Sequence, residues 1–225
     1  MKPTANQVAR AATLAAHVGY TYDELDCQAF VEHCVRQAGG RMDYLGTNDM
    51  ARNAAWLGTV DNARAQGKLV PGAGMLIHED TEANLPAKYR GDGLGDFSHV
   101  GLYVGENALT DTDKNGQKRA CDVVHSSATM GRVAGSTLQN GWTHAGYFRE
   151  IEYGDGDSAA PVPSTPPSSQ TLGSRTLKRG DTGSDVQEMQ ANLMMLGYDL
   201  GSYGADGDFG SRTEKAVMAF QRSRA

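Results

Sequence analysis

The sequence of 225 residues has few cysteines, no long apolar run and no excess of positive charge. Three cysteines, at positions 27, 34 and 121, are too few for a disulfide framework. No apolar run approaches the roughly 20 residues of a membrane-spanning helix, and Met1–Tyr20 lacks the basic and then apolar pattern of a signal peptide. The net charge of -6 argues against nucleic acid as a partner. We therefore expect a monomer that is made in the cytoplasm and has no membrane span.

The segment Leu25–Val31 places a cysteine at the expected start of a helix. The apolar residues of this helix recur at helical spacing: Cys27, Phe30, Val31 and Cys34. Asp26 is a suitable N-cap residue, and Gly39–Gly40 ends the pattern. The positive end of the helix dipole should lower the pKa of Cys27, although a small buried residue would fit the same position. Cys34 lies two turns away, too far for a disulfide, and is expected in the core.

Two histidines lie on segments with the pattern of β-strands. One face of the first strand, over His99–Val104, carries three residues: His99, Gly101 and Tyr103. Gly101 should leave room for a helix to approach that face. A second strand is expected over 120–126 and carries His125, with the polar segment 106–119 as a hairpin connection. Adjacent strands would let one histidine orient the other, whereas an isolated strand histidine is more often structural.

Together these segments resemble the NlpC-type cell-wall peptidases. Four blocks carry the resemblance: Leu25–Val31, Val70–Ile77, His99–Gly105 and Val123–Ser127. It implies an α+β protein with a papain-like fold, in which N-terminal helices pack on a central antiparallel sheet, over residues 1–153. It also implies Cys27 as the nucleophile, His99 as the general base and His125 as the residue that orients and polarises His99. This chemistry requires no metal ion or cofactor.

The residues after the expected nucleophile depart from the family. The family usually continues from the Asp-Cys pair with Ser-Gly, and this chain has Gln28 and Ala29. In relatives that require a free N-terminal alanine on the substrate, the aspartate and the serine help to bind the amine. The resemblance therefore implies substrate contacts at Asp26, Gln28 and Tyr22, with an altered subsite preference. The departure also keeps open a catalytically inactive domain.

The composition changes after Tyr153. Residues 154–176 are rich in Gly, Ser, Pro and Thr, so we expect a flexible linker. A helix with Ser184 as N-cap should follow and end at Gly197. Its buried stripe is expected to hold Val186, Met189, Leu193 and Leu196. A second helix should follow Ser211 and carry Ala216, Val217 and Phe220.

These C-terminal blocks resemble the small helical peptidoglycan-binding domain of many cell-wall hydrolases, here over residues 177–225. The resemblance rests on Arg179–Gly183, Leu196–Tyr198, Asp206–Gly210, Thr213–Glu214 and Ala219–Gln221. The family normally continues into a further helix after the last of these blocks, so we expect a module that is either truncated or weak when isolated. A helical hairpin with an unrelated partner is the alternative.

The two resemblances predict a peptidoglycan hydrolase of the endolysin type, a cysteine endopeptidase. The bond it cuts is expected in stem peptides, between D-glutamate, through its γ-carboxyl group, and diaminopimelate or lysine. Two alternatives stay open: an N-acetylmuramoyl-L-alanine amidase with the same triad, and a non-catalytic wall-binding protein. We expect action at the bacterial cell wall, by a phage or prophage lysin or by an enzyme secreted after removal of a leader.

Two further motifs have competing interpretations. Asp111, Asp113 and Asn115 have the opening spacing of a calcium loop, with Asp122 at the twelfth position. The alternative is a solvated hairpin tip in which Asn-Gly makes the turn. A set of aromatic residues is expected in core strands rather than as platforms that stack on substrate: Trp142, Tyr147 and Phe148.

Overall fold

The computed structural model describes residues 2–154, 172–173, 175–200 and 207–224. The chain divides into two compact units, Met1–Ala160 and Pro161–Ala225. Most of the predicted linker, residues 155–171 and 174, lies outside the described residues. No helix in the described ranges is long and apolar enough to cross a membrane.

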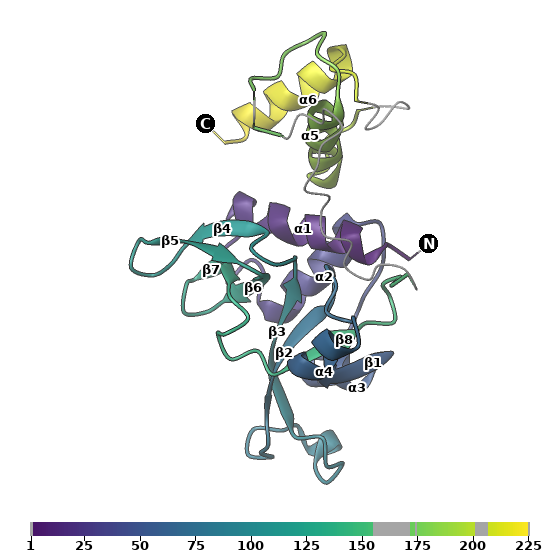
Figure 1. Ribbon diagram of the computed structural model, residues 1–225, viewed down its shortest axis with the longest axis vertical. Coiled ribbons are helices and arrows are strands. Elements are labelled where there is room, and N and C mark those ends of the chain that lie inside the picture. Colours follow the sequence, from purple (N-terminus) through teal and green to yellow (C-terminus); the bar gives the residue numbers. More distant parts are fainter. Residues whose placement is uncertain (1, 155–171, 174, 201–206, 225) are drawn as a thin grey trace. The chain divides into compact units, whose positions relative to one another are not determined.

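Two helices open the first unit (Figure 1): α1 (Ala5–Val18) and α2 (Cys27–Gln37). A capping box begins α1, in which the Thr4 side chain accepts a hydrogen bond from the backbone N–H of Gln7 and the Gln7 side chain accepts one from the backbone N–H of Thr4. The Asp26 carboxylate caps α2 by accepting the backbone N–H of Ala29 at 2.8 Å. The predicted helix start at Cys27 is therefore confirmed.

A six-stranded antiparallel sheet forms the centre of this unit, in the order β1-β8-β2-β3-β6-β7. The strands are β1 (Trp56–Thr59), β2 (Gly74–Glu79), β3 (Asp96–Tyr103), β6 (Val123–Ser127), β7 (Arg132–Ser136) and β8 (His144–Tyr147). Helices α1 and α2 pack against β3 and β6 (Figure 1). On the opposite face, α4 (Val60–Ala65) contributes Ala63 to a buried cluster with Met75, Tyr103 and Trp142. Helices on an antiparallel sheet confirm the α+β class, and the papain-like fold stays a prediction.

The segment between the two histidine strands forms a hairpin of its own. Its strands are β4 (Leu109–Thr112) and β5 (Lys118–Cys121), which pair in a separate two-stranded sheet. The single strand predicted over 120–126 is wrong, because Asp122 separates β5 from β6. The Asp122 carboxylate accepts the backbone N–H groups of Asn107 and Leu138, so it ties two loops together where the strand breaks.

The acidic residues of the calcium-like motif make other contacts. Asp111 forms an ion pair with Arg132 at 2.9 Å and accepts the backbone N–H of Gly135 at 2.7 Å. Asp113 accepts the backbone N–H of Asn115 at 2.8 Å, as expected for the tip of a hairpin. Across the described residues, no group of three or more His, Cys, Asp or Glu side chains is placed to hold a metal ion.

A polar network fixes the start of β3 against α3 (Thr47–Arg52). The Asn48 side-chain amide donates to the buried Asp96 carboxylate at 2.7 Å. Its oxygen accepts the backbone N–H of Phe97 at 3.0 Å and a guanidinium N–H of Arg52 at 2.7 Å. Because His99 follows on the same strand, this network sets the position of that histidine.

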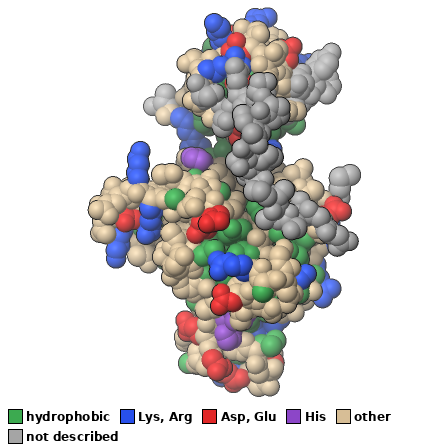
Figure 2. Space-filling view, viewed as in Figure 1, with side chains coloured by type: hydrophobic (Ala, Val, Ile, Leu, Met, Phe, Trp, Pro, Cys, Tyr) green, Lys and Arg blue, Asp and Glu red, His purple; other side chains and the backbone are tan. Residues whose placement is uncertain are grey.

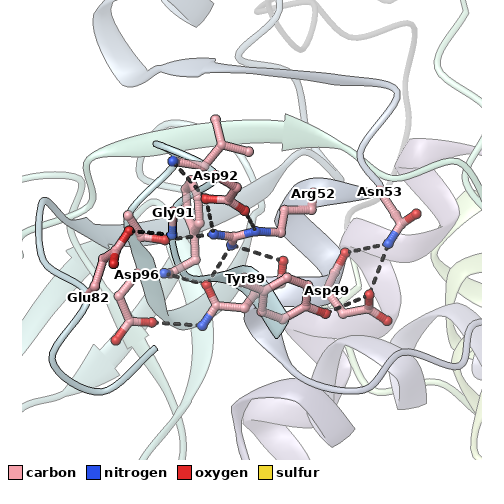
Figure 3. A network of polar contacts seen from close by, with 12 residues as sticks. Asp49, Arg52, Asn53, Glu82, Tyr89, Gly91, Asp92 and Asp96 are labelled. Carbon is pink, nitrogen blue, oxygen red and sulfur yellow. Dashed lines mark hydrogen bonds and ion pairs between the residues drawn. The ribbon is translucent and has the colours of Figure 1, made fainter. Parts of the chain in front are cut away.

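The same network holds the connection between β2 and β3, which includes a 3-10 turn over Ala87–Tyr89 (Figure 3). Arg52 pairs with Asp92 at 2.7 Å, and its guanidinium lies over the Tyr89 ring, 4.5 Å from the centroid. The Tyr89 hydroxyl donates to Asp49 at 2.9 Å. These contacts fasten the long connection to α3 through charged and aromatic groups.

Within its described residues, the second unit contains two helices: α5 (Ser184–Met195) and α6 (Ser211–Arg222). Val186 and Leu193 are buried as predicted, and α5 begins one residue earlier than predicted, with Gly183 as the N-cap. The Gln190 side chain is also buried; it donates to the carbonyl of Asp208 at 2.8 Å and accepts the backbone N–H of Gly207 at 2.7 Å. This amide fastens the loop before α6 to α5, which supplements a small apolar core.

Replacing Asn48 with Ala should lower the free energy of unfolding by about 3 kcal/mol, because it removes the amide that donates to a buried carboxylate. Urea denaturation of the whole chain, followed by tryptophan fluorescence, measures the change. The matched control is Asn53→Ala. Among the residues that the structure describes, the exposed Asn53 amide bonds only to Asp49, so the expected change is within about 0.5 kcal/mol. Equal effects of the two substitutions would show that the network does not stabilise the fold.

Candidate active site

Strands β3 and β6 pair at one end and part toward the histidines. Leu102 pairs with Val124 and Tyr103 with Val123, the last partners of this ladder among the described residues. The backbone N–H of Tyr103 donates to the carbonyl of Ala73, on the β2 side. Since backbone groups alternate along a strand, the N–H of Val100 faces the β6 side, where the ladder has ended.

The start of α2 occupies this split. The backbone N–H of Val100 lies close enough to the Cys27 sulfur to stabilise its thiolate form. From the other strand, the Ser126 hydroxyl donates to the carbonyl of Leu25. The segment before α2 is thus held by both strands, and Cys27 lies beside the residue that follows His99.

The two predicted histidines touch each other across the split. His99 Nε2 lies 2.8 Å from His125 Nδ1, so one ring donates an N–H to the other. Burial lowers the pKa of His99. Burial, together with the charge of His99, lowers the pKa of His125 to about 3. Both rings are therefore neutral near pH 7, and the expectation that adjacent strands bring them together is confirmed.

Trp142 forms a wall behind the histidine pair. Its ring stacks on His99 with centroids 5.6 Å apart and an interplanar angle of 27°, and its edge meets His125. The indole N–H donates to the Ser136 hydroxyl at 3.0 Å. Burial of Trp142 was predicted, but its contact with the histidines was not, because Trp142 lies far from both in sequence.

Gly101 makes this arrangement possible. A Cβ at this position would lie 2.8 Å from the carbonyl oxygen of Val124, 2.9 Å from the His125 Cβ and 2.9 Å from the Trp142 ring. The prediction that Gly101 makes room for a helix is wrong. The space beside Gly101 is filled by His125, Trp142 and the backbone of Val124 instead.

The pKa of Cys27 is raised, contrary to the prediction. Burial is the main cause, and the negative charge of Asp26 adds to it. The backbone N–H groups of Val100, Gln28 and Cys27 act in the opposite direction, as expected at a helix N-terminus, but they do not outweigh burial. The thiol of the free protein is therefore mostly protonated at neutral pH.

The three predicted substrate-contact residues lie around Cys27 but differ in their partners. Asp26 is exposed, and Tyr22 lies close enough for the negative charges of Cys27 and Asp26 to help raise the pKa of its phenol, after burial. The Gln28 amide instead donates to the Glu32 carboxylate at 2.8 Å and to the carbonyl of Tyr44. The Gln28 side chain therefore holds the segment after α2 in place, so its amide N–H groups are used in contacts within the protein.

A cavity of about 350 Å³ opens next to the histidine pair. Its walls come from β2, from the β4–β5 hairpin and from the segment between β6 and Trp142. The lining residues are Ile77, Asp113, Lys114, Asn115, Arg119, His125, Ser127, Thr129, Met130, Gly135, Ser136, Asn140 and Trp142. The site thus combines a thiol, two neutral imidazoles and a neighbouring hollow with charged residues.

Gly101→Ala should reduce the free energy of unfolding by about 1 to 3 kcal/mol and shift the ring signals of His99 and His125, because the new methyl group collides with backbone and ring atoms. Gly146→Ala is the matched control in β8, where the added Cβ meets its nearest atoms at 3.4 Å. Denaturation and histidine 1H–15N spectra provide the two measurements. Unchanged ring signals in Gly101→Ala would contradict the close packing.

Alkylation of Cys27 by iodoacetamide should follow an apparent pKa above the usual value of about 8.5, since burial disfavours the thiolate. Peptide mass spectrometry against pH separates Cys27 from Cys34 and Cys121, both of which are buried. Labelling absent from Cys27→Ser identifies the reactive thiol. An apparent pKa below 7 that rises in His99→Ala would instead indicate a preformed thiolate and imidazolium pair.

Comparison with known proteins assigns the C-terminal region. Residues 182–224 match the peptidoglycan binding domain family. Over 46 residues, 20% of the chain, the sequence is 48% identical to the type VI secretion system spike protein VgrG3 of Vibrio cholerae serotype O1, of which it covers 4%. Over 59 residues, 26% of the chain, it is 42% identical to the N-acetylmuramoyl-L-alanine amidase CwlL of Bacillus licheniformis, of which it covers 16%.

A probable N-acetylmuramoyl-L-alanine amidase of Bacillus licheniformis is 44% identical over 46 residues, 20% of the chain and 13% of that protein. The chain therefore spans less than a fifth of the length of these curated relatives. No solved structure matches the chain. A peptidoglycan-binding domain is present at residues 182–224.

Proposed function

We propose that the protein is a peptidoglycan hydrolase in which the Cys27 thiol attacks an amide bond of a stem peptide. The main support is the position of Cys27 in the split between two strands whose histidines, His99 and His125, share a hydrogen bond of 2.8 Å. The peptidoglycan-binding domain supports a polymeric wall substrate.

The histidine pair has one productive arrangement of protons. With the shared proton on His99 Nε2, His125 Nδ1 accepts the hydrogen bond and His99 Nδ1 carries a lone pair. Because the pKa of His125 is about 3, its ring is neutral at neutral pH, and in the tautomer with the proton on Nε2 its Nδ1 accepts this hydrogen bond. His125 thereby holds His99 in the tautomer that a general base needs.

The reaction begins with a protonated thiol. His99 Nδ1 takes the thiol proton as the Cys27 sulfur forms a bond to the amide carbon. The carbonyl oxygen becomes an oxyanion, for which the backbone N–H of Cys27 at the start of α2 is a suitable donor. Because this N–H belongs to the helix terminus, it stays in place during the reaction.

Collapse of the tetrahedral intermediate breaks the carbon–nitrogen bond, and His99 gives its proton to the leaving amine. The acyl group remains on Cys27 as a thioester. Water, which transfers a proton to His99, then adds to the thioester carbon, and the carboxylic acid product leaves as the proton returns to the sulfur. Every proton that moves is carried by His99.

The choice of bond rests on the resemblance of the first unit to NlpC-type peptidases. It favours the bond between γ-D-glutamate and diaminopimelate or lysine, with Asp26 and Tyr22 beside Cys27 as substrate contacts. The amidases among the relatives share the wall-binding segment, so their names bear on wall binding rather than on the bond cut.

Cys27→Ala should abolish the release of fragments from purified peptidoglycan while the melting temperature stays within about two degrees, since little volume changes at a partly buried site. Mass spectrometry of the fragments identifies the bond. New N-terminal diaminopimelate or lysine supports the endopeptidase, and peptides freed from the lactyl group of the sugar support the amidase.

Cys34→Ser is the matched control for this experiment. Cys34 is fully buried in α2, so a hydroxyl there should lower the melting temperature while fragment release at low temperature is retained. If the two variants exchange these phenotypes, Cys27 is not the nucleophile. If the natural chain releases no more fragments than Cys27→Ala, the protein binds the wall without cutting it.

A further inference from the structure

The β4–β5 hairpin carries charged residues into the cavity beside the histidine pair. Lys114, Arg119 and Asp113 line the cavity, and they come from the tip and the second strand of this hairpin. Figure 2 shows Lys and Arg side chains gathered at the edge of the first unit where Figure 1 places the hairpin. The hairpin therefore adds a charged wall to a hollow that is otherwise lined by polar and apolar residues.

The positive charges of this wall are available to a ligand. Arg119 is half-buried, and no ion pair to it occurs within the described parts of the chain. Asp111, directly opposite in the hairpin ladder, pairs with Arg132 instead. Lys114 is exposed at the tip. A carboxylate that enters the cavity would meet two cationic side chains, with Asp113 as the neighbouring carboxylate that also attracts them.

One acidic group lies on the same wall. Asp113 uses one carboxylate oxygen, Oδ1, to accept the backbone N–H groups of Asn115 and Gln117 at 2.8 and 3.0 Å. These hydrogen bonds, together with the nearby positive charges of Arg119 and Lys114, lower its pKa, so the group is ionised at neutral pH. Its other oxygen can accept a bond from an ammonium group. The cavity thus offers cationic and anionic partners side by side.

The cavity adjoins the histidines that the proposed reaction uses. His125 and Trp142 line the cavity. Ile77, which pairs with His99 in the β2–β3 ladder, lines it too. His99 must reach the leaving amine to protonate it. Whatever is attached to that amine therefore lies on the histidine side, next to the cavity.

We propose that this cavity binds the side-chain end of the diamino acid on the leaving side, and that it recognises a free carboxylate there. The inference rests on the proposed function. In diaminopimelate this end carries a carboxylate, suited to Arg119 and Lys114, and an ammonium group, suited to Asp113. Lysine offers an ammonium group alone, and amidated diaminopimelate lacks the negative charge. The hairpin would thus distinguish substrates by whether this one carboxyl group is free or amidated.

The test measures binding separately from cleavage. The full chain with Cys27→Ala is titrated with two soluble peptides, L-alanyl-γ-D-glutamyl-diaminopimelate with a free or an amidated side-chain carboxyl group. We expect the free carboxylate to bind at least about tenfold more tightly. Adding Arg119→Gln should weaken binding of the free carboxylate about tenfold and leave the amidated peptide unchanged.

Lys118→Gln is the matched control. Lys118 precedes Arg119 in β5, is exposed and does not line the cavity, so the same charge change there should leave both affinities unaltered. The proposed subsite would be overturned if the two peptides bound with equal affinity, or if Arg119→Gln weakened the binding of both peptides equally. The same effect from Lys118→Gln would also overturn it. Failure of the natural chain to cleave either peptide would count against the proposed function, while the binding difference still decides the subsite.

Discussion

The insertion of the α2 N-terminus between β3 and β6 is the contact on which the first unit depends. Beyond the last β3–β6 pair of the described residues, the backbone N–H of Val100 lies beside the Cys27 sulfur. Ser126 anchors the preceding carbonyl of Leu25 from the other strand. Together these contacts hold the start of α2, and with it the thiol, between the two strands.

Burial governs the chemistry of the site more than the helix dipole does. The split encloses Cys27, His99 and His125, and Trp142 covers the two rings, so each group is kept in its neutral form. A neutral thiol beside a neutral base reacts by proton transfer during attack rather than through a standing ion pair. The burial that fixes the geometry around His99 also lowers the fraction of thiolate in the free protein.

The remainder of the first unit supports this geometry from two directions. The network around Asn48 and Arg52 holds the start of β3, while Asp122 holds the start of β6 through two loop N–H groups. Each histidine is thus positioned by a polar anchor a few residues before it. The β4–β5 hairpin lies between the two anchors and places its charges beside the histidine pair. The second unit, which contains the peptidoglycan-binding domain, has a separate small core.

The sequence alone determined the local features: a capped helix that begins at Cys27, a strand that carries each histidine and a helical C-terminal module. These follow from short-range rules, since caps, alternation and helical periodicity act within a few residues. Only the tertiary structure decided that Trp142 covers the histidines, that Asp122 breaks a strand and that burial raises the pKa of Cys27. These outcomes depend on groups far apart in the chain, whose contacts and desolvation no local pattern encodes.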